Sequence, residues 1–340
     1  KAAGDHSLPR HALHMPTTPM ALPALALVGL LALAWEAAGF LEHDAQHCSA
    51  LLQTGSRMSR SDLAQPEDVT ILMGDNRQLF PHGIPASPIN TTWIALAAAL
   101  NLQYAKLHGY RFEFVNYTGN CISPHSLKRH PSWCKLLAIQ DAAQRWSGSS
   151  VVFIDSDAIF ADQSVTVQRY LGSSNLTIPE SNPLVNSTSS SMLAKEQCRL
   201  FLPKNDHKAS SGGSRFANAG IHFWPGPVDR VLLAEWWGAD IYSSKRNWEQ
   251  EALNRYVIKK YPREVCSIDD NPFDLRPGQF MWHHSEVALH KRGHPLSQDF
   301  FPAVFPSLAS SSFTQLMLEL QDHIREMPQD ALDAAAAALN

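Results

Sequence analysis

Hydrophobic positions follow one pattern near the N-terminus and another in the rest of the chain. Residues 20–35 (MALPALALVGLLALAW) form an uncharged apolar run between Arg10 and Glu36. Basic residues precede this run and acidic residues follow it, which predicts a membrane signal-anchor at 20–36. A cleaved signal peptide and a buried soluble helix are the alternatives. We therefore expect an N-terminal tail at 1–19 and a polar stem at 37–66.

From residue 68 onward, short apolar runs alternate with segments that have helical spacing. The pattern predicts strands at 69–73, 110–115, 150–155 and 216–224, and helices at 87–108, 132–146, 228–237 and 248–260. Ser87 would cap the first helix and Gly109 would end it. The β-α-β-α-β order predicts an α/β fold with a mostly parallel sheet flanked by helices. Ligands of such sheets bind beyond the carboxyl ends of the strands.

Composition narrows the function classes. The chain has 28 Lys+Arg against 32 Asp+Glu, a net charge of -4, so it lacks the basic surface that nucleic acids require. Its five cysteines form no CxxC pair, which argues against structural zinc. In an oxidising compartment, this odd number leaves one thiol free or linked to another chain. Glycosylation sequons predict a glycoprotein, and they begin at Asn90, Asn116, Asn175 and Asn186.

The sharpest chemical signal is the segment VVFIDSDAIF, where Asp155 and Asp157 follow a buried strand two residues apart. Strand alternation places both carboxylates on one side. Two such acids at the lip of an apolar strand are best explained by a divalent cation, Mg²⁺ or Mn²⁺. A cation there could hold a diphosphate leaving group. The alternative is that both acids cap the next turn or face solvent.

Six segments in sequence resemble glycosyltransferase family 34. They are LQYAKLHGYRFEFVNY (102–117), HPSWCK (130–135), IDSDAIF (154–160), NAGIHF (218–223), NWEQEAL (247–253) and PGQFMWHH (277–284). The family includes fungal α-1,6-mannosyltransferases and plant galactosyl- and xylosyltransferases. The resemblance implies a GT-A-type nucleotide-diphospho-sugar transferase fold with a Rossmann-like, mostly parallel central sheet. We place the catalytic domain at 67–306 and a helical C-terminal tail at 307–340.

The resemblance also implies a metal centre. Asp155 and Asp157 match the family's DxD pair, and His283 matches the histidine that completes the metal site. Imidazole suits Mn²⁺ better than Mg²⁺, so Mn²⁺ is the expected cofactor and Mg²⁺ the alternative. His284 is the alternative third ligand, because the two histidines are adjacent.

Catalytic roles are implied for Asp157, Glu249 and Gln250. The last two stand where the family usually has Asp-Gln beside the reacting sugar, so this chain carries Glu in place of Asp. The longer side chain moves the carboxylate by one methylene. Gln250 also has a structural alternative, because with Asn247 as helix cap it would complete a capping box.

Substrate-binding roles are implied for five further residues. Lys135 matches the family lysine after HPxW and would neutralise the diphosphate. Asn218, Ala219 and Gly220 match a segment that lines the sugar site, with a tight strand entry as the alternative. Trp282 is the one tryptophan that we assign to sugar stacking, because it stands beside His283.

The resemblance therefore implies a metal-dependent retaining glycosyltransferase. It would transfer a hexose or pentose from a UDP- or GDP-linked sugar to an oligosaccharide or polysaccharide, as a type II Golgi membrane protein within a glycosyltransferase complex. One rival is a haloacid dehalogenase-like phosphatase, whose aspartyl nucleophile also follows a strand, with Asp269 and Asp270 as its later acids. The other is a non-catalytic carbohydrate-binding membrane protein.

Overall fold

A computed structural model describes residues 68–88, 91–173, 176–177, 197–205, 216–242, 248–268, 280–283 and 313–340. The predicted tail, anchor and stem lie outside these ranges, as do Cys48 and the sequons at Asn90, Asn175 and Asn186. Within the described ranges, the helices are too short or too polar to span a bilayer.

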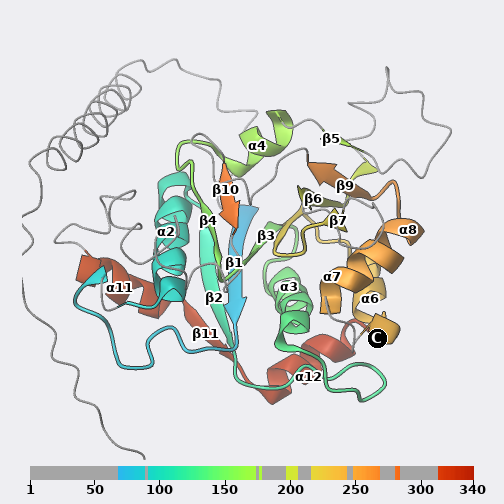
Figure 1. Ribbon diagram of the computed structural model, residues 1–340, viewed down its shortest axis with the longest axis horizontal. Coiled ribbons are helices and arrows are strands. Elements are labelled where there is room, and N and C mark those ends of the chain that lie inside the picture. The colour runs from blue at the N-terminus through green and yellow to red at the C-terminus, as the bar shows by residue number, and fades with distance from the viewer. Residues whose placement is uncertain are drawn as a thin grey trace, which may run out of the picture. The chain divides into compact units, whose positions relative to one another are not determined.

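A central sheet organises the described part of the chain (Figure 1). In the described part of the chain it has nine strands, in the order β11-β2-β1-β3-β8-β6-β9-β5, with β7 paired to β6. The strands are β1 (Val69–Asp75), β2 (Arg111–Tyr117), β3 (Ser150–Asp155), β5 (Leu176–Thr177), β6 (Leu200–Asn205), β7 (Phe216–Ala217), β8 (Ile221–Trp224), β9 (Val265–Ile268) and β11 (Ile324–Met327). Pairing makes β11, β2, β1, β3, β6 and β9 run one way and β8, β7 and β5 the other. The predicted α/β class with a mostly parallel sheet is confirmed.

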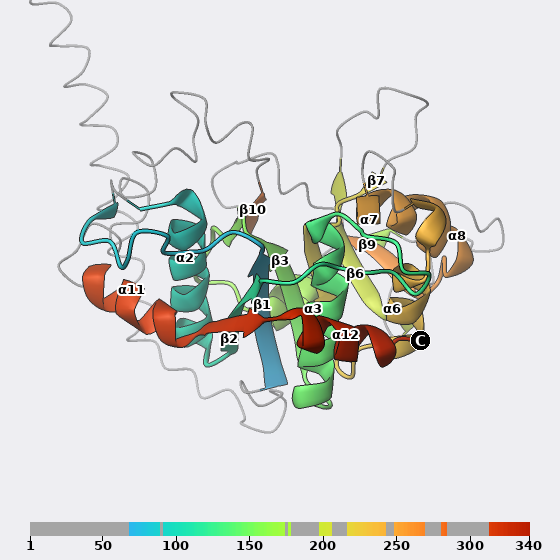
Figure 2. The ribbon, with the colours of Figure 1, turned by 90° about the horizontal axis from the view of Figure 1, so that it is seen from below.

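Helices cover both faces of this sheet (Figure 2). Helices α2 (Trp93–His108) and α11 (Phe313–Asp322) pack on one face, over an apolar cluster that includes Ile71 and Phe114. Helices α3 (Cys134–Arg145), α6 (Arg230–Trp237) and α12 (Gln329–Ala337) pack on the other face. Burial on both sides explains why the central strands are nearly continuous apolar runs. The remaining elements are α4 (Val167–Ser173), α7 (Trp248–Ala252), α8 (Ile258–Lys260), two 3₁₀ turns (Pro131–Trp133, Asp240–Tyr242), and the strands β4 (Ala158–Phe160) and β10 (Met281–His283).

The first helix starts later than predicted. It begins at Trp93, and its cap is Thr92, whose hydroxyl accepts a hydrogen bond from the Ala95 amide; Ser87 is not the cap. The carbonyl of Ser87 instead accepts a hydrogen bond from the Thr91 hydroxyl. Such local side-chain bonds compete with helix formation, which delays the start. Gly109 ends the helix as predicted, with a φ of 68°.

Two predicted elements are interrupted. The strand predicted at 216–224 is split into β7 and β8 by the turn Asn218–Gly220, where the Asn218 side chain accepts a hydrogen bond from the Gly220 amide. The helix predicted at 248–260 contains a π-helical turn at Leu253–Val257 between α7 and α8. Both irregularities lie next to the site described below, where such departures are common.

The C-terminal segment is not only helical. Between α11 and α12 it forms β11, which pairs in parallel with β2 and makes an edge of the central sheet. The prediction of a separate helical tail at 307–340 is wrong in this respect. The sequence did not reveal this strand, because the segment between the two helices is only six residues long and strand periodicity needs a longer window.

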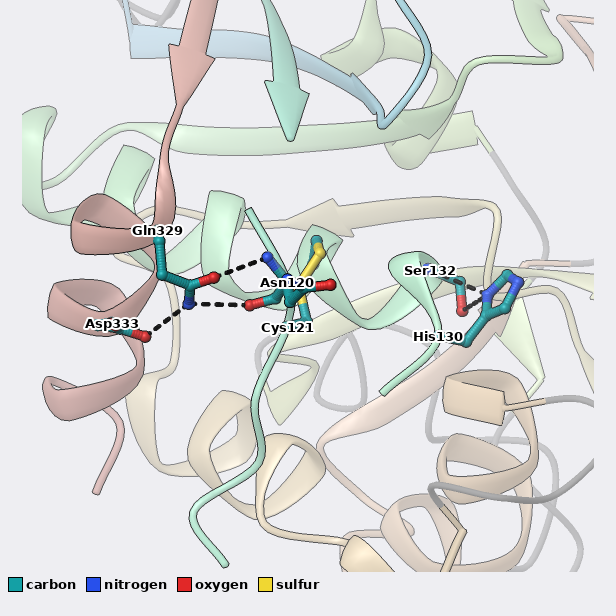
Figure 3. The surroundings of a disulfide bond; sticks show 7 residues. Asn120, Cys121, His130, Ser132, Gln329 and Asp333 are labelled. Carbon is teal, nitrogen blue, oxygen red and sulfur yellow. Dashed lines mark hydrogen bonds between the residues drawn. A yellow bond between two sulfur atoms is a disulfide. The ribbon is translucent and has the colours of Figure 1, made fainter. Parts of the chain in front are cut away.

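Two disulfides tie loops to the sheet region: Cys121–Cys134 and Cys198–Cys266. The first spans the loop between β2 and α3, and Gln329 at the start of α12 binds both the amide and the carbonyl of Asn120 beside it (Figure 3). Because these four cysteines are paired, their thiols are not available as metal ligands. The sequon at Asn116 is buried in β2 and bonded to Glu326, so it is closed to glycosylation in the folded protein.

Candidate active site

The acidic strand end and the late histidine meet in space. Strand β3 ends at Asp155, a turn carries Asp157, and β4 follows at once. Strand β10 pairs antiparallel with β4 and sets His283 opposite Ala158. The ligand atoms of Asp155, Asp157 and His283 all lie within 4.8 Å of one another. His283 Nε2 lies 3.0 Å from Asp157 Oδ1. His284 lies outside the described residues.

Gly220 leaves the room that these three side chains need. A Cβ at this position would lie 2.2 Å from Cε1 of His283 and 2.8 Å from Oδ2 of Asp155. No other residue type could stand here without moving both side chains. The side-chain nitrogen Nδ2 of Asn218 is hydrogen-bonded to Nδ1 of His283 at 2.8 Å, which fixes the plane of the imidazole ring.

Charge also favours a cation at this place. The site holds three carboxylates: those of Asp155 and Glu249 share the buried ammonium of Lys135, and that of Asp157 contacts His283. Burial raises the pKa of Asp155, although Lys135 opposes the shift. For His283, burial alone would lower the pKa, but the Asp157 carboxylate outweighs it and raises the pKa. The excess of negative charge and the mixed oxygen and nitrogen donors fit a divalent ion such as Mn²⁺ or Mg²⁺.

Lys135 is a buried junction between helix α3 and the site. Its ammonium donates to Asp155 Oδ1 at 2.7 Å, to Glu249 Oε1 at 3.0 Å and to the Ala219 carbonyl at 2.9 Å. These three bonds use all three N–H donors of the lysine. The two carboxylates outweigh burial and hold the pKa of Lys135 above its ordinary value. Its contacts are those of a residue that positions Asp155.

Glu249 and Gln250 lie on the first turn of α7, and their side chains contact different groups of the site. Glu249 is buried, and its carboxylate meets the Lys135 ammonium from α7. Its side chain is one methylene longer than the Asp that the family usually has here. Gln250 accepts a hydrogen bond from the Ala219 amide at 3.1 Å. Asn247, its predicted capping partner, lies outside the described residues. The segment Asn218–Gly220 thus connects α3, α7, β3 and β10.

Trp282 is placed differently from its neighbour. Side chains alternate along β10, and Trp282 packs against the apolar cluster under α2, on the opposite side from His283. It is absent from the described residues that line the cavity at the site. The other tryptophans that we assign to the core, Trp133, Trp224, Trp236 and Trp237, are fully buried.

A cavity of about 450 Å³ opens beside the three converging side chains. It lies at the carboxyl ends of β1, β2 and β3 and against the start of α3, where the sheet class predicts a ligand crevice. Its lining consists of Gly74, Asp75, Asn76, Arg77, Tyr117, His130, Pro131, Ser132, Lys135, Phe153, Asp155, Ser156 and Asp157.

Several of these lining residues were not predicted from the sequence. Asp75 is buried and accepts two hydrogen bonds from the Arg77 side chain, at 2.9 and 2.7 Å, and one from the Ser156 hydroxyl. Tyr117 ends β2 and is also buried. The available signal was the position of Asp75 and Tyr117 at the carboxyl ends of two predicted strands.

His130 forms the rim of this cavity on the α3 side. Its ring stacks on Trp248, with centroids 3.5 Å apart and planes within 4°. Burial lowers the pKa of His130, so the ring is neutral at physiological pH. Trp248 has a φ of 41°, which is unusual for a bulky residue and marks local strain. The disulfide-closed loop 121–134 carries His130 to this place.

Comparison with known protein families identifies the class to which this chain belongs. The model of the galactosyl transferase GMA12/MNN10 family matches residues 68–263. The chain belongs to this family, and the resemblance to glycosyltransferase family 34 is confirmed. The match extends from β1 to α8 and includes Asp155 and Asp157, and membership of this family argues against the phosphatase alternative.

Individual relatives are more distant. "Probable alpha-1,2-galactosyltransferase gmh1" of Schizosaccharomyces pombe is 25% identical over 211 residues, which cover 56% of this chain and 60% of the relative. The chain therefore matches less than two thirds of that protein. A glycosyltransferase involved in glycosylation of the major capsid of PBCV-1 aligns with a TM-score of 0.41 and 17% identity, over 64% of this chain and 93% of its own. The glycosyltransferase GlyE of Streptococcus pneumoniae TIGR4 aligns with a TM-score of 0.37 and 11% identity, over 74% of this chain and 63% of its own. These two likenesses are too weak to carry an argument about substrates.

Proposed function

We propose that this protein is a divalent-metal-dependent, retaining glycosyltransferase that uses a nucleotide sugar as donor. The observation that carries the proposal is the convergence of Asp155, Asp157 and His283 beside a cavity at the carboxyl end of the sheet. These three residues would hold Mn²⁺ or Mg²⁺. When bound, such an ion stabilises the negative charge that develops on a departing diphosphate.

The chain's own residues have distinct roles in this proposal. Lys135 holds the Asp155 carboxylate in place, which differs from our first expectation that it meets the diphosphate directly. Gln250 accepts a hydrogen bond from the Ala219 amide and Lys135 donates one to the Ala219 carbonyl, so the backbone of this residue is fixed on both sides of its Cα. This backbone segment would form the rigid wall against which the sugar reacts. Preorganised dipoles of this kind need no rearrangement during the reaction.

The donor and acceptor follow from chemistry and family. The donor would be a UDP- or GDP-linked hexose or pentose, and the galactosyltransferase name of the fission yeast relative makes UDP-galactose the first to test. The acceptor would be an oligosaccharide or polysaccharide. A type II Golgi location through the segment 20–36 and membership of a glycosyltransferase complex complete the proposal.

The test is hydrolysis and transfer of nucleotide sugars by the full chain with Mn²⁺ and with a chelator. We expect activity with at least one donor, loss on chelation, and a loss of at least about 100-fold in Asp157→Asn and His283→Ala. Asp162→Asn is the matched control, because this residue lies in the loop after β4 and, among the described residues, its carboxylate accepts hydrogen bonds only from Ser164. Full activity in chelator would overturn metal dependence, and an inverted anomeric product would overturn retention.

A further inference from the structure

The hydroxyl of Tyr117 is a buried polar group at the cavity to which the proposed reaction assigns no role. Tyr117 is 5% exposed and lines the cavity at the end of β2. Among the described residues, its hydroxyl has no hydrogen-bond partner. A buried hydroxyl without a partner is costly, so such groups in a cavity wall commonly meet a ligand.

Gly74 is what allows the tyrosine to reach this position. Strand β1 lies between β2 and β3, and Gly74 pairs with Val115 on one side and Asp155 on the other. A Cβ at Gly74 would lie 1.9 Å from the Tyr117 hydroxyl oxygen and 2.5 Å from Cζ. The phenol therefore lies directly over the backbone of β1, in the space that any other residue at position 74 would fill.

The surroundings keep this hydroxyl protonated. Burial, followed by the nearby charges of Asp155 and Asp75, raises the pKa of Tyr117 well above its ordinary value. Asp75 is already occupied by Arg77 and Ser156 and so does not need the phenol as a partner. Tyr117 therefore presents an O–H donor to the cavity, and its complement is a ligand atom that accepts a hydrogen bond.

Sheet order indicates which part of the ligand lies there. The carboxylates of Asp155 and Asp157 follow β3, whose neighbours are β1 on one side and β8 on the other. The turn Asn218–Gly220, which matches the family's sugar-site segment, leads into β8. A donor with its diphosphate at the acids and its sugar toward β8 must extend its nucleoside over β1 toward β2, where Tyr117 lies.

We propose that the Tyr117 hydroxyl donates a hydrogen bond to the nucleoside diphosphate part of the donor, and that Gly74 is required to admit it. This inference rests on the proposed function. It assigns Tyr117 to nucleotide binding and not to the transferred sugar, so its loss should raise Kd for the free nucleoside diphosphate and KM for the donor by similar factors, with kcat little changed.

The experiment is calorimetric titration of the full chain with UDP and with GDP in the presence of MnCl₂. For Tyr117→Phe we expect about 10-fold weaker binding of the nucleotide that wild type binds, without loss of thermal stability, because no protein hydrogen bond is removed. Gly74→Ala should weaken binding at least as much. The matched control is Tyr104→Phe, whose hydroxyl donates to the Val165 carbonyl on the other face of the sheet, and which should lose stability but not affinity.

Each outcome decides a different statement. Equal nucleotide affinity in wild type and Tyr117→Phe overturns the role of Tyr117 and leaves the proposed function standing. Unchanged affinity with a reduced kcat places the hydroxyl on the sugar and also overturns it. A wild-type chain that binds neither UDP nor GDP with Mn²⁺ overturns the proposed function together with this inference.

Discussion

Replacing Lys135 by methionine tests the buried charge cluster that positions Asp155. Methionine keeps the length of the side chain and removes the ammonium, which is 4% exposed in the native protein. The change deletes three hydrogen bonds at once and leaves Glu249, itself 6% exposed, without its counter-charge. The carboxylates of Asp155 and Glu249 would then repel each other, because no positive charge lies between them.

The expected loss follows from burial. Removing one partner of a buried ion pair costs about 3–5 kcal/mol, because the other charge stays buried and uncompensated. Asp155 keeps 30% of its side chain exposed, so water screens part of its penalty and Glu249 carries most of the effect. We therefore expect Lys135→Met to lower the free energy of unfolding by about 3 kcal/mol, a large share of the 5–15 kcal/mol typical of a domain.

The assay is urea unfolding of the metal-free full chain with its disulfides intact. The decisive comparison is the double variant Lys135→Met/Glu249→Gln, which removes the stranded charge and should be more stable than Lys135→Met alone. Lys106→Met is the matched control, because its pair with Glu319 is at the surface and should contribute less than about 1 kcal/mol. A double variant less stable than the single one would refute the reasoning.

Three further predictions follow from the same region. Gly220→Ala should lower Mn²⁺ affinity at least about 10-fold in a metal titration, because the new methyl group displaces His283 and Asp155. The control is Gly172→Ala, whose Cβ meets nothing within 4 Å and which should leave Mn²⁺ affinity unchanged. Burial, with the charge of Lys135, holds the pKa of His222 far below its ordinary value, so unfolding takes up a proton below about pH 6.5 and stability falls as the solution becomes more acidic. His222→Gln should make this decline shallower by up to about 1.4 kcal/mol per pH unit in urea unfolding between pH 8 and 5, and parallel curves would contradict the assignment. Replacing Cys121 and Cys134 by serine opens a loop of sequence separation 13, which should lower the free energy of unfolding by about 3 kcal/mol. The KM for the donor should also rise, because this loop carries His130 and Ser132 to the cavity. An unchanged KM would show that the loop keeps its place without the disulfide.

Family membership and the acidic pair could be predicted from the sequence because both depend on short sequence motifs. The run VVFI followed by Asp155 and Asp157 identifies a buried strand with charges at its end, and no tertiary contact is needed to see it. The strand at 150–155 was predicted with its observed bounds for the same reason. His283 was predicted through the family resemblance, and the fold then placed it at the acids.

Caps and interruptions were harder, because neighbouring side chains decide them. Thr92, and not Ser87, caps helix α2. The Asn218 side chain forms a turn with Gly220 that interrupts a strand favoured by the flanking residues. Strand β11 escaped notice because a four-residue edge strand is stabilised by pairing with β2 and not by its own propensity.

The sequence by itself determined the α/β class, the family and the acidic strand end, because periodicity and motif spacing are properties of contiguous segments. Only the tertiary structure decided that Lys135 serves Asp155 and Glu249, and that Tyr117 reaches the cavity across Gly74. Those contacts join positions that are far apart along the chain, and which buried donor meets which acceptor is fixed only when the strands and helices have packed.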